Sequence, residues 1–437
     1  MKTSPKKIHL TTLGCSKNIY DSELLMGQLN GSNAQSVSSP EDADVIIINT
    51  CGFIASAKQE SIDAILEAER IKQNDPAKKV IVCGCLSQRY ASDLKKELPS
   101  IDAFFGTEDY QNILQFLNLN GKSSPEYLYE KRYQLTPSHY AYLKISEGCN
   151  HKCSFCAIPL MRGKHRSRPV ERIIDEAQQL ARKGVKELIL ISQDTTFYGL
   201  DLYNCQRIVD LLKALERIDG LKWIRLHYLY PTTVQDELVE YIGGSGKVVP
   251  YLDMPIQHIS DRMLKIMKRG GTSKRIVDIF ENARSILPNV MLRTTLIAGH
   301  PGETEEDFKM LTNFIRKMRF DRLGVFVYSH EENTTAFEMP DLPQKLIERR
   351  FNELMEIQQK VSMEKNRAKI GTTEYVLIDD VNVQNSVASG RTTGDSPEID
   401  GEVIINDFDA APMPGSFVNV RITDATEYDL FGKIKDG

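Results

Sequence analysis

The sequence predicts an α/β protein in three parts: a parallel α/β amino-terminal domain, a partial (β/α)6 barrel and a small carboxy-terminal β-barrel. Three observations predict this fold. The chain has 437 residues, of which 41% are hydrophobic and 26% charged, enough for several globular cores. Strand-like and helical patterns alternate along most of its length, which is typical of parallel sheets. The last part instead shows short alternating strands between turn signals, as small barrels do.

The amino-terminal domain is predicted to span residues 1–119. Three β-branched apolar runs each precede a helical pattern, and this alternation indicates a parallel sheet. The strands are Lys7–Leu13, Asp44–Thr50 and Lys79–Cys83, and the helices that follow them are Asp21–Leu29, Lys58–Ile71 and Ser87–Leu98. Residues 120–137 contain Gly121, Pro125 and Pro137 together with two serines, so we expect a linker there.

The central domain is predicted to span residues 138–369. Six strand–helix units suggest a (β/α) barrel that is open on one side. The strands are Tyr142–Ser146, Glu187–Ser192, Trp223–Tyr230, Tyr251–Ile256, Met291–Ala298 and Arg322–Tyr328. The charged amphipathic stretch Gln344–Lys369 predicts one long helix that connects to the final domain, residues 370–437. Turn signals at residues 389–390, 400–401 and 414–415 separate the short strands of that β-barrel.

Composition excludes several classes of protein. The apolar stretches are too short to cross a bilayer, and no apolar run follows the basic Met1–Lys7 segment, so we expect neither membrane insertion nor a signal peptide. We therefore expect a cytoplasmic protein. In a reducing cytosol, eight cysteines are better explained as metal ligands or reactive thiols than as disulfides.

The motif Cys149-Asn-His-Lys-Cys153-Ser-Phe-Cys156 is the strongest signal in the sequence. Thiolates are the preferred ligands of iron–sulfur clusters, and three at this spacing can bind three corners of a cubane. The fourth iron is then open to a substrate or cofactor. The cysteine motif follows a predicted strand, at the edge where α/β folds place their chemistry. The alternative is a zinc site completed by His151 or His165, although structural zinc sites usually use two ligand pairs.

Three further cysteines, Cys15, Cys51 and Cys85, each follow a predicted strand by one or two residues. Parallel strands end at one edge of a sheet, so these thiols are expected to gather into a second three-thiolate site. The alternative is three unrelated core cysteines. Cys83 competes with Cys85 for the third place, but it matches a position inside the strand, which favours Cys85. Cys205 lies in a polar loop and has no evident partner.

The group Cys149, Cys153 and Cys156, here called the first cysteine group, resembles the motif of the radical S-adenosylmethionine (SAM) superfamily. In that motif an aromatic residue, here Phe155, precedes the last cysteine. Cys15, Cys51 and Cys85 are called the second cysteine group. The whole chain resembles the radical SAM methylthiotransferase family, with its three-cysteine amino-terminal domain, radical SAM core and OB-like TRAM β-barrel. Three small departures, Ser16, His300 and Asn333, remove no ligand. The matching motifs include Thr12-Leu13-Gly14-Cys15, Asn49-Thr50-Cys51-Gly52-Phe53, Gly84-Cys85-Leu86, Cys156-Ala157-Ile158-Pro159, Arg162-Gly163, the segment 252–258 and Gly299-His300-Pro301-Gly302-Glu303.

This resemblance implies two 4Fe–4S clusters, held by the two cysteine groups, and a reaction that consumes two SAM molecules. One SAM would methylate sulfur at the cluster of Cys15, Cys51 and Cys85. A second, at the cluster of Cys149, Cys153 and Cys156, would yield the radical that abstracts hydrogen from an unactivated carbon. Clusters and SAM would carry the chemistry, and we assign no catalytic side chain. The reaction also requires a low-potential electron donor.

SAM contacts are expected at the ends of barrel strands. A serine, a glutamine and an aspartate after one strand are candidates for the amino group or ribose. An arginine inside another strand could bind the carboxylate, although a buried pair with a barrel carboxylate is an equal alternative. Two glycines would let the backbone approach the adenine. These candidates are Ser192, Gln193, Asp194, Arg293, Gly299 and Gly302.

The family has two main branches, one that modifies an isopentenylated adenosine in transfer RNA and one that modifies an aspartate of a ribosomal protein. From Ile370 to Gly437, 13 acidic residues face four basic ones, a net charge of −9, whereas the rest of the chain carries +4. An acidic TRAM barrel would repel RNA and attract a basic polypeptide, although an acidic surface can also serve solubility alone. The segments Leu226–Pro231 and Tyr142–Gly148 also resemble the protein-modifying branch.

We therefore predict methylthiolation of the aspartate β-carbon in the twelfth small-subunit ribosomal protein, by a monomer that binds RNA weakly. Two rival functions are a transfer-RNA methylthiotransferase, which would show salt-sensitive RNA binding, and a non-catalytic zinc-binding interaction protein, which would be colourless.

Overall fold

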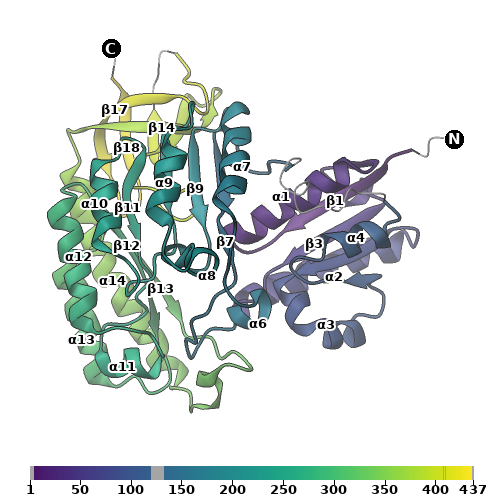
Figure 1. Ribbon diagram of the computed structural model, residues 1–437, viewed down its shortest axis with the longest axis horizontal. Helices are drawn as coiled ribbons and strands as arrows, with labels where there is room; N and C mark the ends of the chain where they lie inside the picture. Colours follow the sequence, from purple (N-terminus) through teal and green to yellow (C-terminus); the bar gives the residue numbers. More distant parts are fainter. Residues whose placement is uncertain (1–3, 120–131, 407, 409, 436–437) are drawn as a thin grey trace.

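The computed structural model describes residues 4–119, 132–406, 408 and 410–435. Figure 1 shows the central barrel on the left, the amino-terminal domain on the right and the carboxy-terminal barrel at the top. Most of the predicted linker, residues 120–131, lies outside the described residues. No described helix has the length and apolar character that crossing a membrane requires.

A five-stranded parallel sheet forms the amino-terminal domain, in the order β2-β1-β3-β4-β5. Its strands are β1 (Lys6–Thr12), β2 (Ala34–Ser36), β3 (Val45–Thr50), β4 (Lys79–Gly84) and β5 (Ala103–Phe104). Four helices cover the two faces, α1 (Ser16–Asn30), α2 (Ala55–Asn74), α3 (Cys85–Glu97) and α4 (Tyr110–Phe116). The parallel sheet that the sequence predicts is confirmed. The prediction missed β2 and β5, which are too short to show a pattern.

The central domain is a partial barrel of six parallel strands, in the order β13-β12-β11-β10-β9-β6. They are β6 (Tyr140–Lys144), β9 (Glu187–Ile191), β10 (Trp223–Leu226), β11 (Val248–Asp253), β12 (Met291–Ala298) and β13 (Arg322–Val327). β10 and β11 end earlier than predicted. Tyr228, two residues beyond β10, has a φ value of 60°, in the left-handed region. Gln257, four residues beyond β11, has a φ value of 70° and still forms an isolated bridge with Leu296 of β12.

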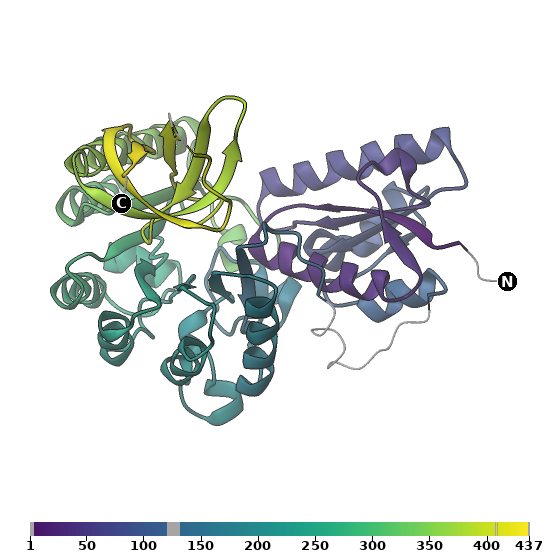
Figure 2. The same cartoon turned by 90° about the horizontal axis from the view of Figure 1, so that it is seen from above.

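Helices cover the outer face of this barrel (Figure 2) and bury one large apolar core against it. The two-stranded ribbon β7 (Ser146–Glu147) and β8 (Arg166–Ser167) frames the first cysteine group. The helices of this domain are α6 (Ile158–Arg162), α7 (Val170–Arg182), α8 (Leu200–Tyr203), α9 (Ile208–Glu216), α10 (Asp236–Gly244), α11 (Asp261–Ile266), α12 (Ser273–Ile286), α13 (Glu305–Met318) and α14 (Gln344–Ala368), with short 3-10 turns at Thr195–Phe197 (η2) and Thr335–Glu338 (η3). A further 3-10 turn, η1 (Pro40–Asp42), precedes β3 in the amino-terminal domain.

The carboxy-terminal domain is a closed barrel in the order β14-β15-β16-β18-β17, as the alternating pattern predicts. Its strands are β14 (Thr373–Asn382), β15 (Val387–Arg391), β16 (Val403–Asn406), β17 (Phe417–Ala425) and β18 (Leu430–Ile434). Valine and isoleucine side chains fill its core. It covers the amino-terminal ends of the central strands, where Trp223 at the start of β10 packs on Phe417 with ring centroids 5.0 Å apart.

The segment 392–400 inserts from this domain into the amino-terminal mouth of the central barrel. Tyr251 Oη donates to Asp400 Oδ2 (2.6 Å), and the Arg322 guanidinium pairs with Asp395 (2.5 Å). Beside the segment, Glu187 pairs with both Arg225 (2.8 Å) and Arg391 (2.6 Å). Part of the acidic charge that the sequence places in this domain is therefore used in domain docking and does not reach the surface.

Buried ion pairs also join the amino-terminal domain to the barrel. Arg132 pairs with Glu23 of α1 and with Glu176 of α7, and all three side chains are at most 2% exposed. Within the described end of the predicted linker, Arg132 and Thr136 are therefore buried, whereas Tyr133 and Leu135 are exposed. On the other side, Glu331 after β13 pairs with Lys58 (2.9 Å) and Arg89 (2.5 Å).

Arg391→Met should loosen the carboxy-terminal barrel, because it removes one partner from a fully buried carboxylate. Burial alone would raise the pKa of Glu187, but Arg391 and Arg225 outweigh that effect and lower it. Breaking such a pair costs roughly 3 kcal/mol. The fluorescence of Trp223, the single tryptophan, reports urea unfolding at this interface. The control Arg421→Met, at an exposed position of β17, should change stability by less than about 0.5 kcal/mol. Equal effects of the two substitutions would contradict the expectation.

Candidate cluster and cofactor site

Cys149, Cys153 and Cys156 lie in the loop between β7 and α6, at the carboxyl end of β6. The Cys149 amide donates to the Gly163 carbonyl (3.1 Å), which closes the loop at its base. Burial raises the pKa of Cys149 to about 11 and that of Cys156 to about 12. The Arg269 guanidinium opposes these shifts, and its Nη1 lies 3.7 Å from the Cys153 sulfur. With these pKa values, the thiols of Cys149 and Cys156 are protonated at neutral pH, so binding a cationic cluster would release their protons.

The second cysteine group forms at the carboxyl edge of the amino-terminal sheet. Cys15 follows β1, Cys51 follows β3, and Cys85 is the first residue of α3 directly after β4. A Cβ on Gly14, beside Cys15, would stand 2.9 Å from the Cys51 sulfur, so the first two loops touch. Burial raises the pKa of Cys51 to about 12, and the nearby thiols of Cys15 and Cys85 add to the shift. The structure thus brings the three predicted cysteines together.

The competing cysteine, Cys83, points elsewhere. It packs into the apolar core on one face of the sheet, whereas Cys85 packs against Ala157 and Met161 at α6. The structure therefore favours Cys85 as the third member of the group. Cys205 is exposed in the loop between α8 and α9.

The predicted zinc alternative finds no support in the two histidines. His151 Nε2 lies 2.7 Å from an Asp194 oxygen, and its ring stacks on Tyr230 with centroids 3.7 Å apart. His165 Nε2 lies 3.1 Å from the Ser167 hydroxyl. In the described part of the chain, no three Cys, His, Asp or Glu side chains are arranged to hold a single metal ion. This result includes the thiols of the two cysteine groups. Three thiolates without a fourth protein ligand are the donor set that a cluster with an open iron requires, and the assignment of the two cysteine groups to such clusters stays a prediction.

A buried ion network lies between the two cysteine groups, and Arg162 of α6 is its centre. The guanidinium donates to Asp21 (2.5 Å), Glu147 (3.1 Å) and Asn18 Oδ1 (2.6 Å). That same Asn18 oxygen lies 3.8 Å from the Cys85 sulfur. Arg162, six residues after Cys156, therefore reaches from the first cysteine group to the second.

On the barrel side, the network continues to the predicted cofactor residues. Gln193 Nε2 donates to Glu147 Oε1 (2.7 Å), and Lys144 donates to Glu147 Oε2 (2.6 Å). Burial would raise the pKa of Glu147, but Lys144 and Arg162 lower it far below its usual range. The carboxylate therefore stays ionised, and it fixes the orientation of the Gln193 amide.

Ser192 and Gln193 fit a polar cofactor at the end of β9. Ser192 is fully buried and its hydroxyl has no hydrogen-bond partner, and Gln193 Oε1 also has none. Buried polar atoms are rarely left unpaired, and such atoms at a candidate site suit a bound ligand. Asp194 is instead used locally, because its carboxylate accepts from the Thr196 amide (3.0 Å) at the start of η2 and binds His151.

The other three predicted SAM contacts have packing roles. Arg293, three residues into β12, pairs with Asp253 (2.9 Å) and Asp400 (3.3 Å), which matches the structural alternative that the sequence left open. A Cβ on Gly299 would stand 2.6 Å from Ile347 of α14, so the glycine permits close helix packing. Gly302 has φ +83° in a turn and faces Met339. None of these contacts supports a role in binding carboxylate or adenine.

Sequence reasoning missed several residues that surround the site. Tyr228 and Gln257 hold strained backbone at two strand ends, a feature that often marks functional sites. Lys17 Nζ lies 3.1 Å from the centre of the Tyr228 ring. Arg269 covers Tyr230 at 4.3 Å. Their residue types carry no local signal, because their roles depend on segments distant in the sequence.

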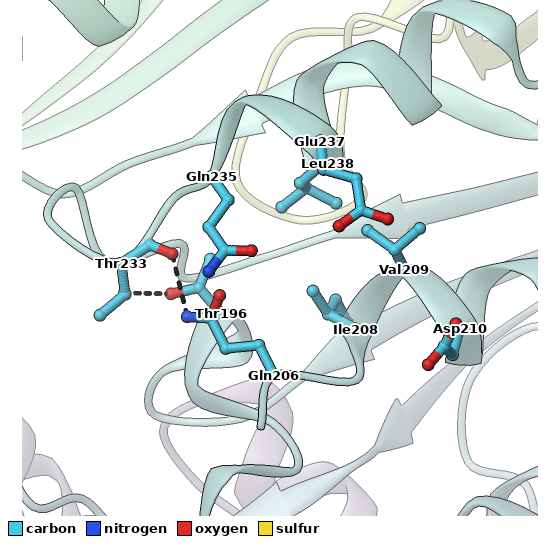
Figure 3. A pocket seen from close by; sticks show the side chains of 9 residues that line it. All are labelled: Thr196, Gln206, Ile208, Val209, Asp210, Thr233, Gln235, Glu237 and Leu238. Atoms are coloured by element: carbon cyan, nitrogen blue, oxygen red, sulfur yellow. Dashed lines mark hydrogen bonds between the residues drawn. The ribbon is translucent and has the colours of Figure 1, made fainter. Parts of the chain in front are cut away.

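A small cavity of about 50 Å³ lies beside η2, between α9 and α10. Figure 3 shows the hydroxyls of Thr196 and Thr233, which hydrogen-bond at 2.5 Å, on one side of it. The opposite side includes Leu238 and Val209. This volume holds a few water molecules but no nucleoside cofactor, so the cavity adds no cofactor site.

Three family models match the chain along most of its length. Residues 7–106 match the uncharacterized protein family UPF0004, residues 143–315 the radical SAM superfamily, and residues 370–434 the TRAM domain. Among solved structures, the radical SAM methyltransferase TsrM from Kitasatospora setae with tryptophan and a SAM analogue has a TM-score of 0.54 at 13% identity, over 73% of this chain and 72% of that one. At this identity the likeness concerns the fold alone.

The fold and the cysteine-bearing loop define a radical SAM enzyme with an additional amino-terminal domain and a TRAM barrel. Over 431 residues the chain is 47% identical to ribosomal protein uS12 methylthiotransferase RimO of Flavobacterium johnsoniae, covering 98% of both chains. It is 48% identical over 429 residues to RimO of Aquifex aeolicus, covering 98% of this chain and 97% of that one. The chain belongs to the RimO family of radical SAM methylthiotransferases.

Cys85→Ala should remove one cluster, whereas Cys83→Ala should not. If both predicted clusters assemble, the anaerobically reconstituted protein should contain about eight iron atoms per chain. Cys85→Ala should lower this to about four, and the matched Cys83→Ala variant should keep about eight. Iron and sulfide analysis measures both. Loss of iron in Cys83→Ala, with retention in Cys85→Ala, would reverse the assignment.

Arg162→Gln should destabilise the contact between the two cysteine groups. It leaves Asp21 and Glu147 to share Lys144, at a cost of roughly 3 kcal/mol, which for a chain of this length corresponds to a melting temperature lower by roughly 3 °C. Arg162→Lys keeps the charge but loses the planar fork, so an intermediate effect is expected. Arg182→Gln, exposed on α7, is the control and should melt like the unmodified protein. An unchanged melting temperature for Arg162→Gln would contradict the central role of this residue.

Proposed function

We propose that this protein transfers a methylthio group to the β-carbon of an aspartate in ribosomal protein uS12. One observation carries the proposal: relatives named uS12 methylthiotransferases are 45–48% identical to this chain over nearly its whole length. The two cysteine groups, joined through α6, are consistent with it. As a member of this family, the protein uses SAM and 4Fe–4S clusters.

The chain's own residues would hold these groups as follows. Cys15, Cys51 and Cys85 bind one cluster, and the cysteines of the β7–α6 loop bind the other. Ser192 and Gln193 offer their unpaired polar atoms to SAM. When bound, the clusters and SAM supply the radical and sulfur chemistry, at a cost of two SAM per turnover. The protein holds the two sites in a fixed relation, which lowers the entropic cost of bringing the reacting groups together.

Arg162 places a positive charge beside the second cysteine group, whose residues would bind a cluster as thiolates. Burial lowers the pKa of its guanidinium, but Asp21, Glu147 and the nearby thiols of Cys85 and Cys15 outweigh this and raise it. The cation is therefore permanent. On the other side, Arg269 gives the β7–α6 cysteines a second permanent cation. Each cysteine group thus has one buried or half-buried arginine that stabilises its thiolate form.

The acceptor is proposed to be protein and not transfer RNA. Several acidic residues of the TRAM barrel are paired with arginines: Asp379 within the domain, and Asp395 and Asp400 with the central barrel. The remaining acidic residues still outnumber the basic ones, so the domain would repel phosphates and attract a basic polypeptide. We further propose a cytoplasmic monomer that depends on a low-potential electron donor.

An anaerobic acceptor assay tests this function. Reconstituted protein, SAM, sulfide and a strong reductant are incubated with purified uS12 and, in parallel, with unmodified isopentenylated transfer RNA. Mass spectrometry should find one added methylthio group on an aspartate of uS12 and none on the RNA. Cys85→Ala should abolish the product. A product on the RNA alone would show that the acceptor is nucleic acid.

A further inference from the structure

A groove of about 260 Å³ runs between the barrel, α14 and the TRAM domain. It lies far from the segment that joins the two cysteine groups, and the proposed chemistry does not use it. Its lining combines β13, α14 and two TRAM loops, and includes Arg322, Gly324, Gln358, Ile399, Glu427 and Tyr428.

One side of the groove is the last strand of the six-stranded sheet. β13 pairs with β12, and no strand in the described part of the chain pairs with its other edge. Further along the strand, Phe326 is 50% exposed and Val327 is 37% exposed. Proteins normally protect an apolar edge of this kind, because its unpaired peptide groups accept another strand. An exposed edge beside a groove therefore indicates a place for an extended polypeptide.

Two buried polar atoms in the groove lack partners, one acceptor and one donor. Gln358 of α14 is 4% exposed, and its Oε1 has no hydrogen-bond partner although its Nε2 donates to the Phe320 carbonyl (2.9 Å). The Arg322 Nε also has no partner. A peptide group offers one N–H donor and one carbonyl acceptor, so an added strand can satisfy both atoms.

The charge of the groove selects a basic occupant. Its two arginines are already neutralised, because Arg322 pairs with Asp395 and Arg293 pairs with Asp253 and Asp400. The unmatched charges are those of Glu427 and Asp429 at the TRAM rim. A positively charged polypeptide is therefore favoured, and a nucleic acid is repelled.

We propose that an extended basic segment of the protein substrate binds in this groove as an added strand on the free edge of β13. The inference rests on the proposed function, and it assigns the surface that recognises the substrate. The carboxyl end of β13 leads to Glu331, which docks the amino-terminal domain with its second cysteine group. A strand laid along β13 from the TRAM rim is therefore directed toward the edge of the barrel where the cysteine groups lie.

Gly324→Leu tests the groove by steric exclusion. A Cβ at this position has no atom within 4 Å, so the leucine extends into the groove without a clash. The matched control is Gly246→Leu, which also has open space and lies in the loop before β11. Binding of fluorescently labelled uS12 to the reconstituted protein is measured by anisotropy. Gly324→Leu should weaken it at least tenfold, and Gly246→Leu should leave it unchanged, with equal iron content in both.

Charge reversal and hydrogen exchange provide independent readouts. Glu427→Lys should weaken uS12 binding several-fold at low salt and less at high salt, whereas Glu240→Lys, exposed on α10, should have no effect. In the unmodified protein, uS12 should slow amide exchange within Gly324–Val327. This second measurement needs no variant and so does not depend on how Gly324→Leu folds.

The outcomes separate this inference from the proposed function. If the unmodified protein modifies uS12 but Gly324→Leu binds it equally well and exchange in β13 is unchanged, the groove assignment is wrong and the function stands. If transfer RNA and not uS12 slows amide exchange in β13, the proposed polypeptide occupant is wrong and the groove binds nucleic acid. If the protein neither binds nor modifies uS12, both proposals fall.

Discussion

The buried ion network around Arg162 is the interaction on which the relation between the two cysteine groups depends. Arg162 lies six residues after Cys156 of one group and reaches Asn18 and Asp21 beside the other. Buried charged side chains are stable only when each is paired. Lys144 and Glu147 complete the pairing of Arg162 and Asp21. The geometric precision of such pairs keeps two domains in one arrangement, which apolar packing alone specifies less strictly.

Buried ion pairs also attach the TRAM barrel, at the opposite end of the central barrel. Its segment 392–400 enters the amino-terminal mouth, where Glu187, Arg225 and Arg391 are buried. The mouth is thereby closed away from solvent, and the carboxyl edge is left for the cofactors. Part of the acidic charge of this domain is therefore used in docking, and only the charge that remains at the surface bears on the proposed acceptor. The free edge of β13 lies at the groove between this domain and the central barrel.

The site combines buried thiols with permanent cations. Burial raises the pKa values of Cys51, Cys149 and Cys156 because the apolar surroundings disfavour a thiolate. Arg162 and Arg269 oppose that effect, which prepares the groups for a positively charged cluster without leaving them reactive in its absence. The unpaired Ser192 hydroxyl and Gln193 oxygen add neutral polar atoms at the same edge.

The sequence alone was sufficient for the fold class, because strand–helix alternation is a local property. It also predicted the two cysteine groups, one from the local spacing of Cys149, Cys153 and Cys156 and the other from the places of Cys15, Cys51 and Cys85 after predicted strands. The preference for Cys85 over Cys83 also came from the sequence, and the tertiary structure adds that Cys83 packs into the apolar core of the domain whereas Cys85 packs against α6. The tertiary structure also gave Arg293 and Gly299 packing roles and drew acidic TRAM residues into the interior. Pairing and burial depend on segments hundreds of residues apart, and no local pattern records them. For the same reason, Arg162 and the open edge of β13 became visible only in the folded chain.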